Sequence, residues 1–189
     1  MRATVRAGSS PREGDMRVSA AIHLLPASDS RFPTALRAIP DCPSSLWFIG
    51  RLEALDAPIV AIVGSRAASA VALEMASRLA ANLARRGVTI VSGLARGVDS
   101  AAHRRALSQG VTVAVLGSGP DVIYPPEHRE LAAEISRDGL VLSEYPPGRA
   151  PHGHRFLVRN RLIAALSRGT VVVEAAARSG ALATARRAR

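Results

Sequence analysis

The sequence predicts an α/β protein with an extended Rossmann-like, doubly wound and mostly parallel sheet. Two short runs rich in β-branched residues, 59–63 and 88–91, are each followed by a glycine-containing loop and then by a helical pattern. Runs this apolar are typical of strands buried on both faces of a parallel sheet. Because crossovers between parallel strands are right-handed, repetition of this unit predicts one sheet of about five strands.

Regular alternation of strands and helices is expected from residue 58 onward. In chain order we expect a strand at 59–63, a helix at 68–86, a strand at 88–91, a helix at 98–109, a strand at 111–116, a helix at 127–137, a strand at 140–142, a helix at 159–166, a strand at 170–174 and the start of a helix at 180–187. A long loop rich in proline, glycine and histidine, 144–155, is expected before the helix at 159–166.

Two of these helices carry informative patterns. In the helix at 68–86 the large apolar residues recur at i, i+4 spacing, which marks the face that normally packs on the core. These residues are Val71, Met75, Leu79 and Leu83. In the helix at 98–109, Asp99 is expected to act as a cap or dipole partner, and His103, one turn later, to pack between elements.

We expect three segments along the chain. Residues 1–30 are punctuated by proline, serine, glycine and arginine and predict a loose N-terminal extension, although 18–25 could hold a short ordered segment. Residues 31–57 carry scattered apolar side chains among prolines and predict a packed but irregular lead-in on the sheet. Residues 58–189 are expected to form the Rossmann-like domain.

Composition argues against several classes of protein. No apolar run approaches the ~20 residues of a membrane span, and the polar, basic start of the chain, 1–17, has no apolar region typical of a secretory signal. Cys42 is the single cysteine, which excludes an internal disulfide and a zinc site built from cysteines. We therefore expect a cytoplasmic protein with no membrane partner.

The formal net charge of +10 at pH 7 fits a protein that binds nucleic acid. All 25 basic residues are arginine, however, and the chain is rich in alanine, so part of this charge can reflect a coding bias. The positions of the arginines must therefore decide the question. The absence of lysine excludes a P-loop and Schiff-base chemistry, because both need an amine.

The loops that follow the strands carry small hydroxyls, glycines and arginines, and in a parallel sheet these loops open at one edge. Such residues suit a phosphodiester backbone through N–H groups, hydroxyls and guanidinium charge. The candidate DNA- or phosphate-binding residues are Gly64, Ser65, Arg66, Ser92, Gly93, Arg96, Gly117, Ser118, Gly119, Arg155, Phe156, Arg159, Asn160, Arg161, Ser179 and Gly180. Phe156 could stack on a base, or it could anchor the long loop in the core.

Other chemistry is not favoured by the sequence. Arg66 stands where a dinucleotide-binding motif has its second glycine, so we do not expect NAD. His152 and His154 are not accompanied by carboxylates or cysteines, and we expect no metal site. Glu174 could act as a general base, but no nucleophile is evident near it. We expect no catalytic residue, no cofactor and no enzymatic activity.

Six ordered runs carry a resemblance to a known family. They are 62–66; 91–99 with Ala102-His103; 114–119 with 124–127; 143–148; Phe156 with 159–163; and 172–175 with 179–182 and Thr184-Ala185. Over about residues 32–186 the chain resembles the DNA-processing protein family, DprA, also called Smf.

The resemblance implies an extended Rossmann domain that binds single-stranded DNA, protects it and helps to load the RecA recombinase during natural transformation. It also implies a homodimer without established enzymatic activity. By motif, Gly64-Ser65-Arg66 corresponds to the family's phosphate-binding loop. Phe156, Arg159, Asn160 and Arg161 correspond to its DNA-contacting segment.

The chain departs from the family pattern in three places. Leu157 stands where the family usually has proline. The family continues beyond Thr184-Ala185 with more helix and a further strand, so we expect a sheet that lacks its last strand and a domain that is incomplete at its C-terminal end. We also expect no counterpart of the family's N-terminal helical domain.

Two alternative functions remain open. One is a Rossmann enzyme that acts on nucleotides, of the phosphoribohydrolase type, which shares the general architecture. Those enzymes resemble P-G-G-x-G-T-x-x-E in the late loop, whereas here Glu174 precedes Ser179-Gly180. The other alternative is a truncated copy without function.

Overall fold

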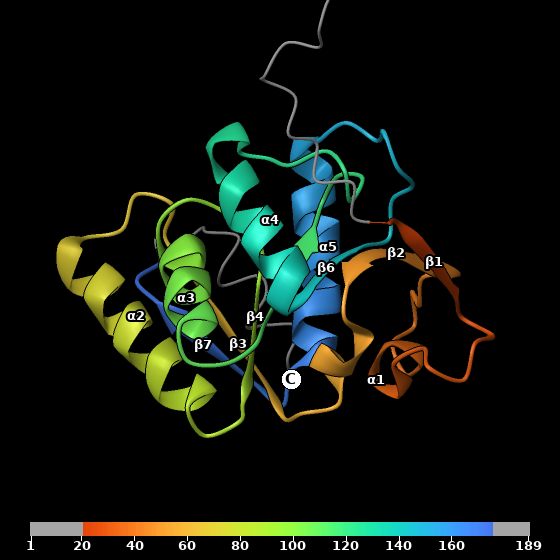
Figure 1. The fold of residues 1–189 in the computed structure, drawn as a ribbon. Helices are drawn as coiled ribbons and strands as arrows, with labels where there is room; N and C mark the ends of the chain where they lie inside the picture. Colours follow the sequence, from red (N-terminus) through yellow and green to blue (C-terminus); the bar gives the residue numbers. More distant parts are fainter. Residues whose placement is uncertain (1–20, 176–189) are drawn as a thin grey trace, which may run out of the picture.

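The computed structural model describes residues 21–175 of the 189-residue chain, which form one sheet with helices on both faces (Figure 1). The sheet has seven strands in the order β1-β2-β6-β5-β4-β3-β7. They are β1 (His23–Pro26), β2 (Ser45–Gly50), β3 (Ile59–Gly64), β4 (Thr89–Ser92), β5 (Thr112–Leu116), β6 (Leu140–Ser143) and β7 (Gly169–Val173). Strands β3 to β7 pair in parallel, which confirms the predicted doubly wound, mostly parallel sheet.

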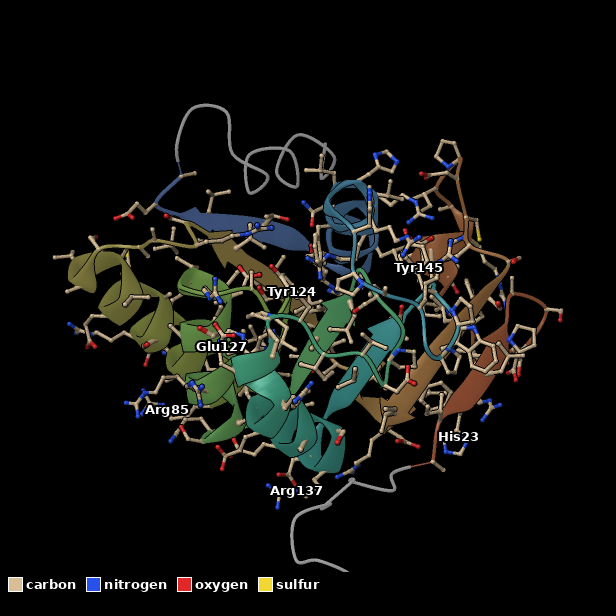
Figure 2. The ribbon with its side chains drawn as sticks, turned by 90° about the horizontal axis from the view of Figure 1, so that it is seen from above. His23, Arg85, Tyr124, Glu127, Arg137 and Tyr145 are labelled. Atoms are coloured by element: carbon tan, nitrogen blue, oxygen red, sulfur yellow. The ribbon has the colours of Figure 1, made fainter. Side chains whose placement is uncertain are left out.

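Helices cover the two faces of this sheet. They are α1 (Thr34–Arg37), α2 (Ala70–Ala84), α3 (Val98–Leu107), α4 (Arg129–Asp138) and α5 (Gly153–Leu166), with short 3-10 helices at Leu52–Leu55 and Pro126–His128. Figure 2 shows the layers from above, with α5 on one side of the strands and α3 and α4 on the other. None of the helices in residues 21–175 is long and apolar enough to cross a membrane.

A hydrophobic core lies on each face of the sheet. On the α5 side, Phe32 and Leu162 are buried against strand residues such as Val113. On the opposite side, Ile62 and Ile90 pack against the alanine-rich faces of α2 and α3. The strand residues are buried from both sides because helices cover both faces, which explains their continuous apolar runs.

Two strands of the sheet were not expected from the sequence. β1 lies within the expected loose extension, 1–30, and overlaps the segment 18–25 that could be ordered, while β2 lies within the expected irregular lead-in, 31–57. Both are antiparallel and extend the sheet beyond β6, with Trp47 opposite Ser143 and Leu25 opposite Leu46. Nearby prolines argue against strands in a sequence, and the partners with which these short strands pair are distant in the chain. Both facts made β1 and β2 difficult to predict.

Helix α5 begins at Gly153, six residues before the expected start. The Nδ1 atom of His152 accepts a hydrogen bond from the backbone N–H of His154 at 3.4 Å, so His152 acts as the N-cap. The expected loop 144–155 is correspondingly shorter. Arg155 and Phe156 therefore lie on the first turn of a helix.

Helix α2 buries a different face from the one predicted. Val71 and Met75 are 74% and 57% exposed, whereas Ala76 and Ala80 are fully buried. Alanine has no side chain beyond Cβ, so this face lets α2 approach the sheet and α3 closely. Of the predicted stripe, Val71 and Met75 face away from the core, whereas Leu79 and Leu83 are half-buried and pack against it.

The expected helix at 180–187 and any strand after it lie outside the described residues. Ser179 and Gly180, which we expected at the binding site, lie there too.

Candidate nucleic-acid interface

A crevice opens where the carboxyl ends of the central strands meet the first turns of α5. Its volume is about 760 Å³. Among the predicted residues, Gly64, Ser65, Arg66, Phe156, Arg159 and Asn160 line it. Figure 2 looks onto this edge of the sheet, with Tyr124 near its middle. Strand ends of an open α/β sheet are where such proteins bind ligands.

The loop after β3 is held by main-chain contacts on both sides. The Ser65 N–H donates to the Glu174 carbonyl at 2.7 Å, and the Ser65 carbonyl accepts from the Val98 N–H at 3.2 Å. A Cβ on Gly64 would lie 2.0 Å from the Val173 carbonyl oxygen, so only glycine fits between β3 and β7 here. The loop is therefore fixed in shape before any ligand arrives.

The carboxylate of Glu174 holds the other end of the same loop. It accepts hydrogen bonds from the Ser69 N–H at 3.0 Å and from the Ser69 hydroxyl at 2.5 Å. The Ser69 hydroxyl in turn caps α2 by accepting from the Ala72 N–H at 3.2 Å. This geometry gives Glu174 a positioning role, because its carboxylate is engaged with the start of α2.

An arginine and an aromatic ring face each other across the crevice. The guanidinium carbon of Arg66 lies 5.8 Å from the centroid of the Phe156 ring. The ring of Tyr124 lies 5.5 Å from the same centroid in a tilted arrangement. A Cβ on Gly117 would lie 2.8 Å from Cδ1 of Phe156, so this glycine makes room for the ring. Phe156 thus packs on the protein and still lines the crevice.

Arg159 lies beneath the crevice and is only 4% exposed. Its guanidinium donates to the carbonyls of Gly93 and Val115, at the ends of β4 and β5. Burial lowers the pKa of Arg159 to about 10, which still leaves it charged at neutral pH. We conclude that Arg159 organises the strand ends that form the floor.

Asp99 supports the same floor from the start of α3. Its Oδ2 accepts hydrogen bonds from the N–H groups of Gly93 at 3.1 Å and Ala95 at 3.3 Å. Between them Leu94 adopts a left-handed conformation with φ 59°. Burial raises the pKa of Asp99, and the nearby charge of Arg159 opposes this effect. The N-cap of α3 is Gly97, without a side-chain cap hydrogen bond, so Asp99 lies in the first turn of the helix and its carboxylate holds the loop after β4.

Arg161 does not fit the expectation that it contacts DNA. Its side chain is 10% exposed and pairs with the Asp41 carboxylate at 2.6 Å and with Glu144 at 2.7 Å. Successive α5 residues point in different directions, so Arg161 and Arg159 face different neighbours. Arg161 is not among the residues that line the crevice. It joins α5 to the loop after β6 and to the segment before β2.

The other predicted residues have internal partners. The Ser92 hydroxyl donates to the Ile62 carbonyl and the Ser118 hydroxyl to the Val122 carbonyl, both at 2.6 Å. The backbone N–H of Gly119 donates to the Arg149 carbonyl at 2.8 Å. Exposed Arg96 pairs with Glu127 at 2.5 Å. Such contacts shape the loops around the crevice.

Arg155 lies on the first turn of α5. It donates to the Ala150 carbonyl at 2.5 Å, and its guanidinium carbon lies 5.4 Å from the centroid of the Tyr145 ring. Arg155 therefore stabilises the loop before α5 and is not among the residues that line the crevice.

Two groups that contribute to the crevice were not among the residues expected there. Tyr124, which is 44% exposed, supplies the second aromatic ring. The residues at the start of α5, 151–153, also line the crevice. A tyrosine before two prolines in a strand-end loop was the available signal for Tyr124. Within residues 21–175, no group of three or more His, Cys, Asp or Glu residues could hold a metal ion.

The fold and this site define a class of protein, α/β proteins with an open crevice at the carboxyl ends of the strands of a Rossmann-like sheet. A family model described as DNA recombination-mediator protein A matches residues 23–189. The chain belongs to this family.

Individual relatives agree with this assignment. The chain is 52% identical over 150 residues to the putative DNA processing protein DprA of Mycobacterium tuberculosis, covering 78% of this chain and 39% of the relative. It is 46% identical over 161 residues to DNA processing protein DprA of Streptococcus pneumoniae, covering 85% and 57%. The chain thus spans about half the length of its curated relatives.

Solved structures show the same fold. The X-ray structure of DprA from S. pneumoniae matches with a TM-score of 0.85 and 44% identity, covering 88% of this chain and 59% of that one. The structure of DprA from Helicobacter pylori, described for its single-stranded DNA binding mode, matches with a TM-score of 0.83 and 35% identity, covering 92% and 78%.

Proposed function

We propose that this chain binds single-stranded DNA in the crevice, protects it and participates in loading the RecA recombinase during DNA uptake. The observation that carries the proposal is the tethered 64–69 loop with Arg66 facing Phe156. A guanidinium beside an aromatic ring can hold a phosphate and a stacked base together. The H. pylori relative, described for binding single-stranded DNA, supports the same ligand here.

The crevice favours a single strand over a duplex for a physical reason. A base can stack on Phe156 only when one of its faces is not already covered by its neighbours in a helix. Three predicted arginines are candidates for phosphate contacts: Arg66 lines the crevice, Arg96 lines a hollow beside it, and Arg155 precedes Phe156 in the chain. Arg96 and Arg155 each have one protein partner, Glu127 and the Ala150 carbonyl, whereas Arg159 and Arg161 are buried among several. About three phosphate contacts predict a log–log salt slope of roughly −2 for single-stranded DNA.

The remaining parts of the proposal follow from the family. A recombination mediator needs a recombinase partner, and we propose RecA and a homodimer as the active assembly. The protein would act in the cytoplasm, where the DNA is, and without catalysis of its own. Glu174 fits this proposal because its carboxylate positions Ser69.

Fluorescence anisotropy of labelled oligo-dT and of a duplex, at several salt concentrations, tests the proposal. The protein is first shown to be folded by circular dichroism. We expect a salt-sensitive preference for the single strand. Folded protein with no such preference would contradict the proposal. Release of free base from nucleoside monophosphates would instead indicate the nucleotide-enzyme alternative, and absence of both activities a copy without function.

A further inference from the structure

A second basic hollow lies between α2 and α3, away from the crevice. Its volume is about 210 Å³. The residues that line it are Arg78, Ala81, Asn82, Arg85, Arg105 and Gln109. All three arginines are exposed, and no carboxylate is among the lining residues. We call this hollow the α2–α3 groove.

The arginines of the α2–α3 groove differ from many others in the protein. Arg31, Arg96 and Arg161 each pair with a carboxylate. Within residues 21–175, no carboxylate forms a salt bridge with Arg78, Arg85 or Arg105. The Arg85 guanidinium donates to the side-chain oxygen of Asn82, which is uncharged. The groove therefore concentrates positive charge that the described part of the protein does not neutralise.

Helix α2 extends from the loop of the crevice to the α2–α3 groove. Helix α2 begins at the residue after Ser69, where the loop that carries Arg66 ends. An open hollow of about 660 Å³ runs along α2 from Ala70 to Asn82 and shares Arg78 and Asn82 with the groove. Figure 1 shows α2 at the edge of the helical layer with α3 beside it. The 15 residues of α2 span about 22 Å, roughly six nucleotides at the spacing of one DNA strand.

The chemistry along this surface fits a nucleic-acid strand. Guanidinium groups suit phosphates, and the exposed side chains of Val71 and Met75 offer apolar contact between the loop and the groove. Glu74 is the one carboxylate that lines the hollow along α2. We propose that the α2–α3 groove is a second phosphate-binding site, which holds the strand where it continues beyond the crevice. The proposal rests on the proposed function.

Probe length separates the two sites. We expect oligo-dT of about 6 nucleotides to use the crevice alone and oligo-dT of about 20 nucleotides to reach the groove as well. The test variant is R78A/R85A/R105A. The matched control is R51A/R129A/R137A, which removes the same charge from exposed arginines elsewhere. Circular dichroism melting shows that each variant is folded.

For the long probe, the test variant is expected to bind at least about tenfold more weakly at low salt and to lose about 1 to 2 units of salt slope. Binding of the short probe is expected to stay within about twofold of the unsubstituted protein, and the control variant to lose much less affinity for the long probe. Glu74→Gln is expected to strengthen binding of the long probe alone, because it removes the negative charge on the path.

Several outcomes would overturn the inference. One is long-probe binding by the test variant that equals that of the control. Another is an equal loss for both probes. If the test variant lost affinity for poly-glutamate but not for the long probe, the groove would belong to an acidic polypeptide instead. Failure of the unsubstituted protein to bind even the short probe would overturn the proposed function itself, and with it the second site.

Discussion

Arginines that the sequence placed together in one predicted binding site have different roles in the structure. Arg66 faces the Phe156 ring in the crevice, Arg159 binds carbonyls beneath it, and Arg161 pairs with carboxylates. A guanidinium whose donors are all directed at protein acceptors has little capacity left for a phosphate. The position of each arginine relative to acceptors, more than the net charge, therefore decides which can bind DNA.

Replacing Arg66 by alanine tests this distinction at a single residue. We expect weaker binding of all single-stranded sequences and a salt slope that flattens by about 0.7, because one phosphate contact is lost. The measurement is anisotropy of labelled oligo-dT across a salt series. Arg161→Ala serves as the contrast, since it should lower stability by removing the partner of Glu144 and leave the slope unchanged. An unchanged slope in Arg66→Ala would remove Arg66 from the phosphate contacts.

Among the elements, α2 shows that the face with small side chains is the one buried, because it allows the helix to pack closely. Its small residues face the sheet and α3, and its large apolar residues Val71 and Met75 face outward. α2 also connects the parts of the proposed DNA path, because it begins at the 64–69 loop and borders the α2–α3 groove. The identity of its buried face therefore sets the shape of the surface that DNA would follow.

Substitutions on the two faces of α2 are expected to differ in the size of their effect on the free energy of unfolding. Ala80→Leu inserts a larger side chain into a fully buried position and should lower the free energy of unfolding by about 1–3 kcal/mol. Met75→Ala removes an exposed side chain and should change it by less than about 0.5 kcal/mol. Urea denaturation followed by circular dichroism compares them. A large loss for Met75→Ala with none for Ala80→Leu would contradict the observed orientation of α2.

At the scale of the whole molecule, the layers are joined by buried polar groups as well as by apolar packing. The Thr112 hydroxyl donates to the Ile90 carbonyl at 2.7 Å, so the Nδ1–H of His103 must donate to Thr112, at 2.7 Å. Among the described residues, Nε2 of His103 has no hydrogen-bond partner. Burial lowers the pKa of His103 to about 3, and the nearby His128 and Arg159 act in the same direction. The folded protein therefore holds this imidazole neutral.

This buried imidazole predicts a pH dependence of global stability. The pKa of His103 in the unfolded chain is about 6.5, so below that pH the unfolded state binds a proton that the folded state does not. The resulting stability is complete above about pH 6.5 and is lost as the pH falls toward the folded-state pKa of about 3. Between pH 7 and pH 5 we expect a loss of about 2 kcal/mol from this residue.

Denaturant unfolding at pH 7 and pH 5 measures this loss, with His103→Gln as the comparison. Glutamine can donate to Thr112 but does not titrate, so the variant should lose less stability between these two pH values. Asp29, whose pKa is held at about 2 by hydrogen bonds from Arg31, changes charge at lower pH and does not interfere. Equal pH dependence in both proteins would show that His103 is not the cause.

The sequence by itself determined the class of fold and the edge of the sheet that carries the crevice. Apolar runs separated by helical patterns define parallel strands, and parallel strands bring their following loops to one edge. Residues that are adjacent in the chain, such as Gly64-Ser65-Arg66, were therefore found correctly at that edge. Local sequence is sufficient for such features because their geometry depends on the strand they follow.

The tertiary structure decided the features that depend on distant partners. The bonds of Arg159 to strand ends, the pairing of Arg161 with Asp41 and Glu144, and the buried face of α2 all join segments far apart in the sequence. The strands β1 and β2 likewise exist because they pair with each other and with β6. The partner of a side chain depends on which elements the fold brings within a few ångströms of it. The local sequence pattern does not indicate which distant elements these are.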